Sequence, residues 1–262
     1  MRLATFNLLS GRSVPDGEIR TQDLVDAATE LDADVVGLQE VDRHQDRSGG
    51  VDQTATVADA LGARWSRFVP SVDGTPGAAW TPSTDEDGSV TTGPRYGVGL
   101  VSRFPVLSFQ VRRFGPAPIG LPLLVPGRPG LTLVPDEPRL ALAAVIEGPG
   151  GPVTVLTAHL SFVPGWNVRQ LRAIARWARS MPAPRFLVGD FNLPGAVPRL
   201  VTGWTQLARV PTYPSWRPRV QLDHVLADRP TSVDAAHALR LQVSDHCALA
   251  VDVELPRGTA HW

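Results

Sequence analysis

The chain has 262 residues, of which 43% are hydrophobic and 19% are charged, and this length suffices for one large domain with a sizeable core. Its 25 basic residues are all arginine and nearly balance 26 acidic residues, so the net charge of −1 excludes a strongly basic nucleic-acid-binding protein. The single cysteine, Cys247, excludes an internal disulfide framework and a multi-cysteine metal site.

Short runs rich in valine and leucine, each bounded by turn residues, predict β-strands along the whole chain. These runs cover residues 2–7, 34–39, 97–102, 141–147, 153–158, 186–189, 221–227 and 247–254. Apolar residues at helical spacing predict three helices between them, at 18–31, 52–61 and 166–179. Because the later strands follow one another closely, we expect a mixed two-sheet sandwich flanked by helices rather than one parallel sheet.

Two segments interrupt this pattern, 70–96 and 115–138, and both are rich in proline and glycine. We expect each to be a long surface loop, and such loops can wall a substrate cleft. We expect a single domain over residues 1–256 and a C-terminal tail at 257–262. Since no apolar run approaches signal-peptide length or the roughly 20 residues that span a bilayer, we expect a cytoplasmic protein without an integral membrane segment. We also expect a monomer.

Six short polar motifs follow or begin apolar runs, where strand ends and loops gather site residues on a rigid scaffold. They are TFNLLSG (5–11), LQEVD (38–42), TAHL (157–160), GDFN (189–192), QLDHVL (221–226) and SDHCAL (244–249). These motifs supply mainly carboxylate and amide oxygens and few nitrogens, a set that suits Mg²⁺ or Mn²⁺ better than Zn²⁺. The motifs therefore predict a site for a hard divalent cation.

Glu40 is the best single metal-ligand candidate, because it follows a buried run that would place its carboxylate at the end of a strand. The alternative is a surface acid that ends the strand. Asp190 and Asn192 lie two residues apart, so in extended backbone their side chains would face the same side. Alternatively, this Asp-x-Asn sequence forms a local turn.

His246 is the most reactive candidate, because a neutral imidazole accepts a proton near pH 7. Adjacent residues of a strand face opposite sides, so Asp245 should not orient His246, and Asp223 from another strand is the candidate partner. His159 follows its own apolar run, and it either donates to an anionic oxygen or is a satisfied histidine at a strand end.

In this order, and together with YGVGLVSRFP (96–105), the motifs resemble the endonuclease/exonuclease/phosphatase superfamily, which includes pancreatic deoxyribonuclease, exonuclease III and neutral sphingomyelinases. The resemblance covers residues 3 to about 254. It implies a four-layer α/β sandwich of two mixed β-sheets flanked by helices, with the site at one rim. It also implies a phosphoric ester hydrolase that uses Mg²⁺, with Mn²⁺ as a substitute, for in-line attack of water on phosphorus.

The resemblance also implies which residues bind the metal and the phosphate. Asn7 and Glu40 match the positions that hold the catalytic Mg²⁺, and Asp245 matches a second carboxylate on the metal side. His159 matches the residue that bonds a nonbridging phosphate oxygen. Asn192 matches the amide that holds the phosphate or the nucleophile.

Three further matches concern proton transfer. Asp190 matches the aspartate that positions or deprotonates the attacking water, and Asp223 matches the aspartate that pairs with His246. The sequence leaves open which of Asp190 and His246 is the general base, so we assign this role to the pair.

Position alone adds five candidate substrate-binding residues. Arg43, His44 and Arg47 follow the LQEVD motif, where they either meet further phosphate oxygens or form a solvated charged loop. His224 is a second candidate, with a structural histidine as the alternative. Trp216, in the segment TYPSW, either lines the site or packs under the next strand.

The expected substrate is a phosphate ester, with a small or medium phosphodiester as the first choice, because the net charge does not indicate a general nucleic-acid-binding surface. A nuclease acting on DNA or RNA is the alternative among enzymes. A catalytically silent phospholigand-binding module is the alternative of another class, but a silent module does not need the complete set of site residues.

Overall fold

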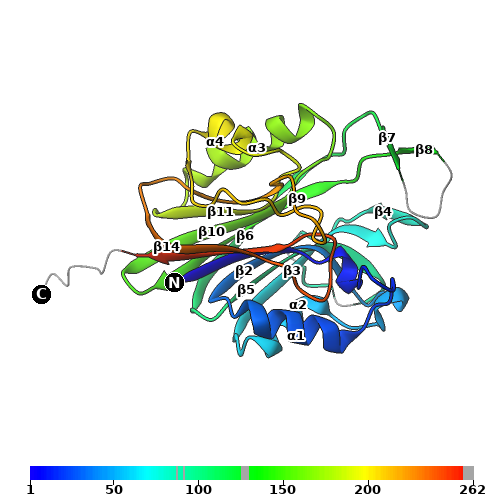
Figure 1. Ribbon diagram of the computed structural model, residues 1–262, viewed down its shortest axis with the longest axis horizontal. Helices are drawn as coiled ribbons and strands as arrows, with labels where there is room; N and C mark the ends of the chain where they lie inside the picture. The colour runs from blue at the N-terminus through cyan, green and yellow to red at the C-terminus, as the bar shows by residue number, and fades with distance from the viewer. Residues whose placement is uncertain (87, 91, 125–129, 256–262) are drawn as a thin grey trace, which may run out of the picture.

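The computed structural model describes residues 1–86, 88–90, 92–124 and 130–255, so the expected tail at 257–262 lies outside the described residues. Two mixed β-sheets lie face to face, and helices cover the outer face of each (Figure 1). In spatial order, the seven-stranded sheet consists of β14 (Ser232–Leu239), β15 (Ala248–Glu254), β1 (Arg2–Asn7), β2 (Val35–Arg43), β5 (Arg95–Ser102), β3 (Trp65–Gly74) and β4 (Trp80–Pro82). The six-stranded sheet consists of β12 (Thr205–Gln206), β13 (Asp223–Ala227), β11 (Arg185–Asp190), β10 (Gly151–His159), β9 (Arg139–Gly148) and β6 (Val106–Phe114).

The helices belong to the two outer layers. Helices α1 (Thr21–Leu31) and α2 (Gln53–Ala60) cover the seven-stranded sheet, and α3 (Trp166–Ala178) and α4 (Val197–Thr202) cover the six-stranded sheet (Figure 1). Two short 3₁₀ helices, η1 (Leu9–Gly11) and η2 (Asp46–Ser48), follow β1 and β2. A separate hairpin pairs β7 (Leu121–Leu124) with β8 (Leu131–Val134). None of the helices in the described part of the chain has the length and apolar character that crossing a lipid bilayer requires.

Alternation along each strand divides the apolar side chains between three layers of core. In β1, Leu3 faces the opposite sheet, whereas Ala4 and Phe6 face α1 and α2. In β11, Val188 faces the space between the sheets and Leu187 faces α3. The expected four-layer sandwich is therefore confirmed.

The predicted strands and helices are all present, with ends shifted by a few residues. The first helix begins at Thr21 rather than at residue 18, because Ile19 forms an isolated β-bridge with Arg12. The two expected loops are not structureless. Segment 70–96 contains the end of β3, all of β4 and the start of β5, and segment 115–138 contains the hairpin of β7 and β8. The proline and glycine residues of these segments favoured loops, but pairing with a neighbouring strand holds β4 and the hairpin in extended backbone.

The two sheets approach most closely around Gly37 of β2. A Cβ atom added at Gly37 would lie 2.3 Å from Thr157 Oγ1 and 2.7 Å from Val188 Cγ2, both on the opposite sheet. Beside it, Gln39 Nε2 donates to Thr157 Oγ1 at 3.0 Å, and this hydrogen bond links the sheets directly. Only glycine leaves room for this spacing.

We predict that Gly37→Ala lowers the free energy of unfolding by about 1–3 kcal/mol, because the added methyl group overpacks the contact between the sheets. Chemical denaturation monitored by circular dichroism measures the change. Gly115→Ala is the matched control, since a Cβ at Gly115 meets no atom within 4 Å. Equal denaturation midpoints for the two variants would contradict the prediction.

Candidate active site

Three neighbouring strands of the six-stranded sheet place polar residues side by side. His159, the last residue of β10, pairs in register with Asp190, the last residue of β11, and Asp190 pairs with Asp223, the first residue of β13. In each strand, the residue two positions away faces the opposite sheet, as Val188 does beside Asp190 and Val225 beside Asp223. Side chains two residues apart in a strand point to the same side. The side chains of His159, Asp190 and Asp223 therefore meet at the rim of the space between the sheets.

Asn7 brings the other sheet into the site. It is the last residue of β1, and its Nδ2 donates to Glu40 Oε1 and to Asp190 Oδ2, both at 3.0 Å. Its Oδ1 accepts from the Leu9 backbone N–H at 3.1 Å, which fixes the orientation of the amide. Asn7 thus joins one carboxylate of each sheet.

A β-bulge directs Glu40 into the site. The pairing of β2 with β5 shifts register between Leu38 and Val41, and Glu40 has a φ of +52°. In regular alternation Glu40 would follow Leu38 onto the face covered by α1 and α2, but the bulge turns it toward the rim instead. The strand does not end at Glu40, as the sequence suggested, but continues to Arg43.

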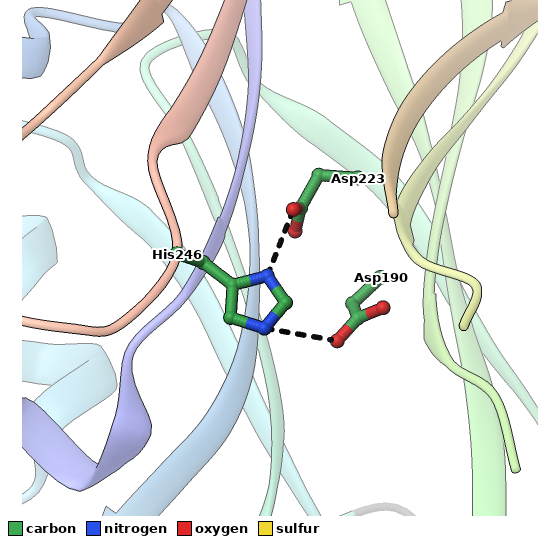
Figure 2. A group of neighbouring side chains, drawn as sticks. All are labelled: Asp190, Asp223 and His246. Carbon is green, nitrogen blue, oxygen red and sulfur yellow. Dashed lines mark hydrogen bonds and ion pairs between the residues drawn. The ribbon is translucent and has the colours of Figure 1, made fainter. Parts of the chain in front are cut away.

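Asp245 and His246 precede β15 and do not lie in a strand, so the expected opposite orientation is wrong and both residues line the same cavity. The expected partner of His246 is confirmed, because its Nδ1 lies 2.8 Å from Asp223 Oδ2. Figure 2 shows the imidazole between two carboxylates, with Nε2 directed toward Asp190 Oδ2 at 3.8 Å.

Asp190 and Asn192 both line the cavity, although the backbone between them is not extended. Asn192 has a φ of +50°, and its N–H donates to Asp190 Oδ1 at 3.0 Å. The local turn and the shared site, which the sequence left as alternatives, therefore occur together.

The rim holds a cavity of about 600 Å³. Carboxylates, histidines, an amide, arginines and tyrosines line it, among them Glu40, Asp190, Asp245, His159, His246, Asn192, Arg12, Arg47, Arg139, Tyr96 and Tyr213. Asn7 and Asp223 lie behind this lining and hydrogen bond to it. The chain therefore gathers all eight predicted catalytic and metal-ligand candidates in one place.

The carboxylates of the cavity are held where ionisation is unfavourable. Enclosure away from water raises the pKa of Glu40 to about 7, a change that the Asn7 hydrogen bond opposes and that Asp245 reinforces. Burial also raises the pKa of Asp190 and of Asp245. A bound cation would offset this concentration of negative charge, and the carboxylate oxygens of Glu40 and Asp245 fit a hard divalent ion, with Asn7 beside them to orient Glu40.

His246 favours its charged form, whereas the carboxylates around it favour their neutral forms. Burial disfavours its charged form, but the carboxylates of Asp223 and Asp190 outweigh burial and raise the pKa of His246 to about 10. Possible ligand atoms of these three residues also lie within 4.8 Å of one another. Because a hydrogen bond already joins Asp223 to His246, we interpret the three residues as a proton-transfer group.

The structure places three of the five substrate-binding candidates outside the lining of the cavity, where their side chains have other environments. Arg43 pairs with Asp52 at 2.8 Å, and His44 Nδ1 bonds the Gly50 carbonyl at 3.1 Å. Trp216 is 52% exposed, so it neither lines the cavity nor packs under a strand. Arg47 does line the cavity. Its guanidinium donates two hydrogen bonds, of 2.7 and 2.8 Å, to the buried carboxylate of Asp42.

His224 also lies outside the lining of the cavity. Strand alternation turns it away from Asp223 and into the layer under α3 and α4, where its ring stacks on Phe191 and its Nε2 donates to the Leu193 carbonyl at 2.8 Å. Burial lowers the pKa of His224 to about 4, so it is a neutral structural histidine.

Sequence reasoning left several residues of the cavity unassigned, and two of them contact the predicted histidines. The Tyr213 ring lies 4.8 Å from the His246 ring, and Arg139 lies 3.1 Å from His159. A signal for Arg139 was available, since it is a charged residue at the start of the long apolar run of β9. In an antiparallel pair, that start lies beside the end of β10, which carries His159.

Comparisons with known proteins agree with this geometry. No curated protein matches the sequence. Among solved structures, an endonuclease/exonuclease/phosphatase from Beutenbergia cavernae has 22% identity and a TM-score of 0.64, covering 97% of this chain and 71% of that chain. A mannosyl-6-phosphatase from Bacteroides thetaiotaomicron has 14% identity and a TM-score of 0.64, covering 97% and 100%. A sphingomyelinase C from Streptomyces griseocarneus has 16% identity and a TM-score of 0.57, covering 96% and 98%.

At these sequence identities the solved structures show only a shared fold. The family is shown by the match of the sequence to a family model. The model of the endonuclease/exonuclease/phosphatase family matches residues 4–246, which is most of the chain. That span begins ahead of Asn7 and ends at His246, so it contains every predicted catalytic and metal-ligand candidate. The protein therefore belongs to the endonuclease/exonuclease/phosphatase family, whose members are phosphoesterases.

Proposed function

We propose that this protein hydrolyses a phosphodiester by attack of a water molecule, with the help of a divalent cation. The observation that carries the proposal is the position of one oxygen, Asp190 Oδ2. It lies 3.0 Å from Asn7 Nδ2, 3.5 Å from His159 Nε2 and 3.8 Å from His246 Nε2. Donors from both sheets thus converge on one carboxylate, which fixes its position as a candidate base for a water molecule bound in the cavity.

The residues that would hold the cation are Glu40, with Asp245 and Asn7 beside it. A bound Mg²⁺ would offset the negative charge that develops on the phosphoryl oxygens and the leaving group. The protein supplies the remaining steps with its own side chains.

Asp190 and His246 are placed to orient the water and to take its proton. Their facing atoms are 3.8 Å apart, so one water molecule can contact both. Because His246 favours its charged form, it can orient the water, and Asp190 is the member of the pair that can take the proton. Asp223 holds His246 in place through Nδ1. On the other side of Asp190, His159 Nε2 and Asn192 Nδ2 lie 3.4 Å apart and are placed to donate to nonbridging phosphate oxygens.

The charge of the cavity favours a diester over a monoester. Two of the three arginines that line the cavity already have carboxylate neighbours, because Arg47 pairs with Asp42 and Arg139 lies 3.5 Å from Asp136. These two guanidinium groups are therefore less available to balance the second negative charge of a monoester. A phosphodiester carries one negative charge, which the cation and the neutral donors can accommodate.

We predict turnover of bis-p-nitrophenyl phosphate with Mg²⁺ or Mn²⁺, slower turnover of p-nitrophenyl phosphate, and loss of both in EDTA. Release of p-nitrophenol measures the rates, with plasmid DNA, RNA and sphingomyelin as further substrates. Faster cleavage of the monoester would contradict the diester assignment. No turnover of any substrate would favour a phospholigand-binding module.

We predict that Glu40→Gln raises the Mg²⁺ concentration needed for half-maximal activity by roughly tenfold or more, because a charged oxygen ligand is lost. A Mg²⁺ titration of bis-p-nitrophenyl phosphate hydrolysis measures this concentration. Glu30→Gln, on the exposed face of α1, is the matched control. If Glu40→Gln and the control titrate alike, Glu40 is not a metal ligand.

We predict that Asp190→Asn and His246→Ala each lower kcat by roughly 10²–10⁴-fold, the usual scale for a lost general acid or base. Circular dichroism establishes whether each variant keeps its fold. Asp26→Asn, an exposed position on α1, controls for the loss of a carboxylate elsewhere. Wild-type rates in either site variant would remove the assignment of the pair.

A further inference from the structure

A buried arginine touches the histidine that faces the substrate phosphate in the proposed function. Arg139 begins β9 and is 6% exposed, and its Nη1 lies 3.1 Å from His159 Nδ1. Arginine remains protonated in proteins and offers only hydrogen-bond donors. Nδ1 of His159 must therefore accept, which requires a lone pair on Nδ1 and places the hydrogen of the neutral ring on Nε2.

We propose that Arg139 is a positioning residue that holds His159 in the tautomer with its hydrogen on Nε2, the nitrogen that faces the cavity. The consequence for catalysis rests on the proposed function, because it assumes that Nε2–H donates to a phosphate oxygen. The assignment of the tautomer itself rests only on the contact between the two side chains.

The surroundings of Nε2 agree with this tautomer. Asp190 Oδ2 lies 3.5 Å away and is an acceptor for an Nε2–H. The Asn192 amide nitrogen lies 3.4 Å away and can offer Nε2 only a long hydrogen bond from a neutral donor, because one of its two hydrogens is directed to the Leu160 carbonyl at 2.9 Å. The charged donor at Nδ1 is closer, so it outweighs this contact and favours the tautomer with its hydrogen on Nε2, which can donate to Asp190.

The guanidinium of Arg139 has charged and aromatic neighbours besides His159. Asp136 Oδ1 lies 3.5 Å from its Nη2, and the ring of Phe162 lies 5.9 Å from its central carbon. Asp136 is fixed in turn, because its Oδ2 accepts from the Ala117 N–H at 2.7 Å and from Ser161 Oγ at 2.8 Å. The segment that was expected to be a loop thus contributes the support for Arg139.

The two histidines of the site have partners of opposite charge at the same ring atom. A carboxylate meets Nδ1 of His246, and a guanidinium meets Nδ1 of His159. Burial, together with Arg139 and then His246, holds the pKa of His159 well below its usual value. His159 thus donates a hydrogen bond as a neutral ring, while His246 favours the charged form.

The test is a long-range ¹H–¹⁵N correlation spectrum of the histidine rings in the full chain at pH 7.5, without substrate or metal. A His159→Gln variant assigns the signals of His159. In the wild type we expect a protonated Nε2 and an unprotonated Nδ1. In Arg139→Met we expect partial or full transfer of the hydrogen to Nδ1, and in Arg139→Lys we expect recovery of the wild-type pattern. Arg12→Met, which removes another arginine of the cavity, should leave the pattern unchanged.

A hydrogen on Nδ1 in the wild-type spectrum would overturn the proposal even if no variant folds. An unchanged spectrum in folded Arg139→Met would also overturn it. In kinetics we expect Arg139→Met to lower kcat by about 10–100-fold, the scale for a lost orienting partner, with an unchanged Mg²⁺ titration and partial recovery in Arg139→Lys. Because the spectra need no turnover, failure of the proposed function and failure of the Arg139 assignment are separate results.

Discussion

The side-chain amide of Asn7 joins a carboxylate on its own sheet to one on the opposite sheet, and the candidate active site depends on this contact across the sandwich. Such a contact requires sheets that lie close together. Gly37 permits this spacing because it has no side chain, and the Gln39 hydrogen bond to Thr157 keeps the polar groups at the interface satisfied. Packing deep between the sheets therefore sets the geometry at the rim.

The site concentrates buried charge, which folding tolerates only where each group has a partner. The charged neighbours of the two histidines differ in sign. Asp223 stabilises a charged His246, and Arg139 disfavours charge on His159. Burial raises the pKa of both Glu40 and Asp245, and no ion pair joins either carboxylate to an arginine among the described residues, which is why we propose that a bound metal completes the arrangement.

Much of the candidate site was predictable because its residues follow the period of the strands. His159, Asp190 and Asp223 each extend an alternating series that faces the opposite sheet, and the pairing of Asp223 with His246 followed from that reasoning. The same alternation turns His224, the residue after Asp223, away from the candidate site. Arg43 and Trp216 were chosen by position alone, and position does not determine which way a loop residue points.

The sequence by itself determined the strands with buried apolar runs, the mixed two-sheet architecture and the polar residues that end those strands, because alternation and ligand chemistry are local properties of the chain. Only the tertiary structure decided that a bulge turns Glu40 toward the rim, that Arg139 meets His159, and that strands such as β3 and β6 exist. These features depend on which strands become neighbours and in what register. That choice is made by packing between segments far apart in the chain, so no local pattern records it.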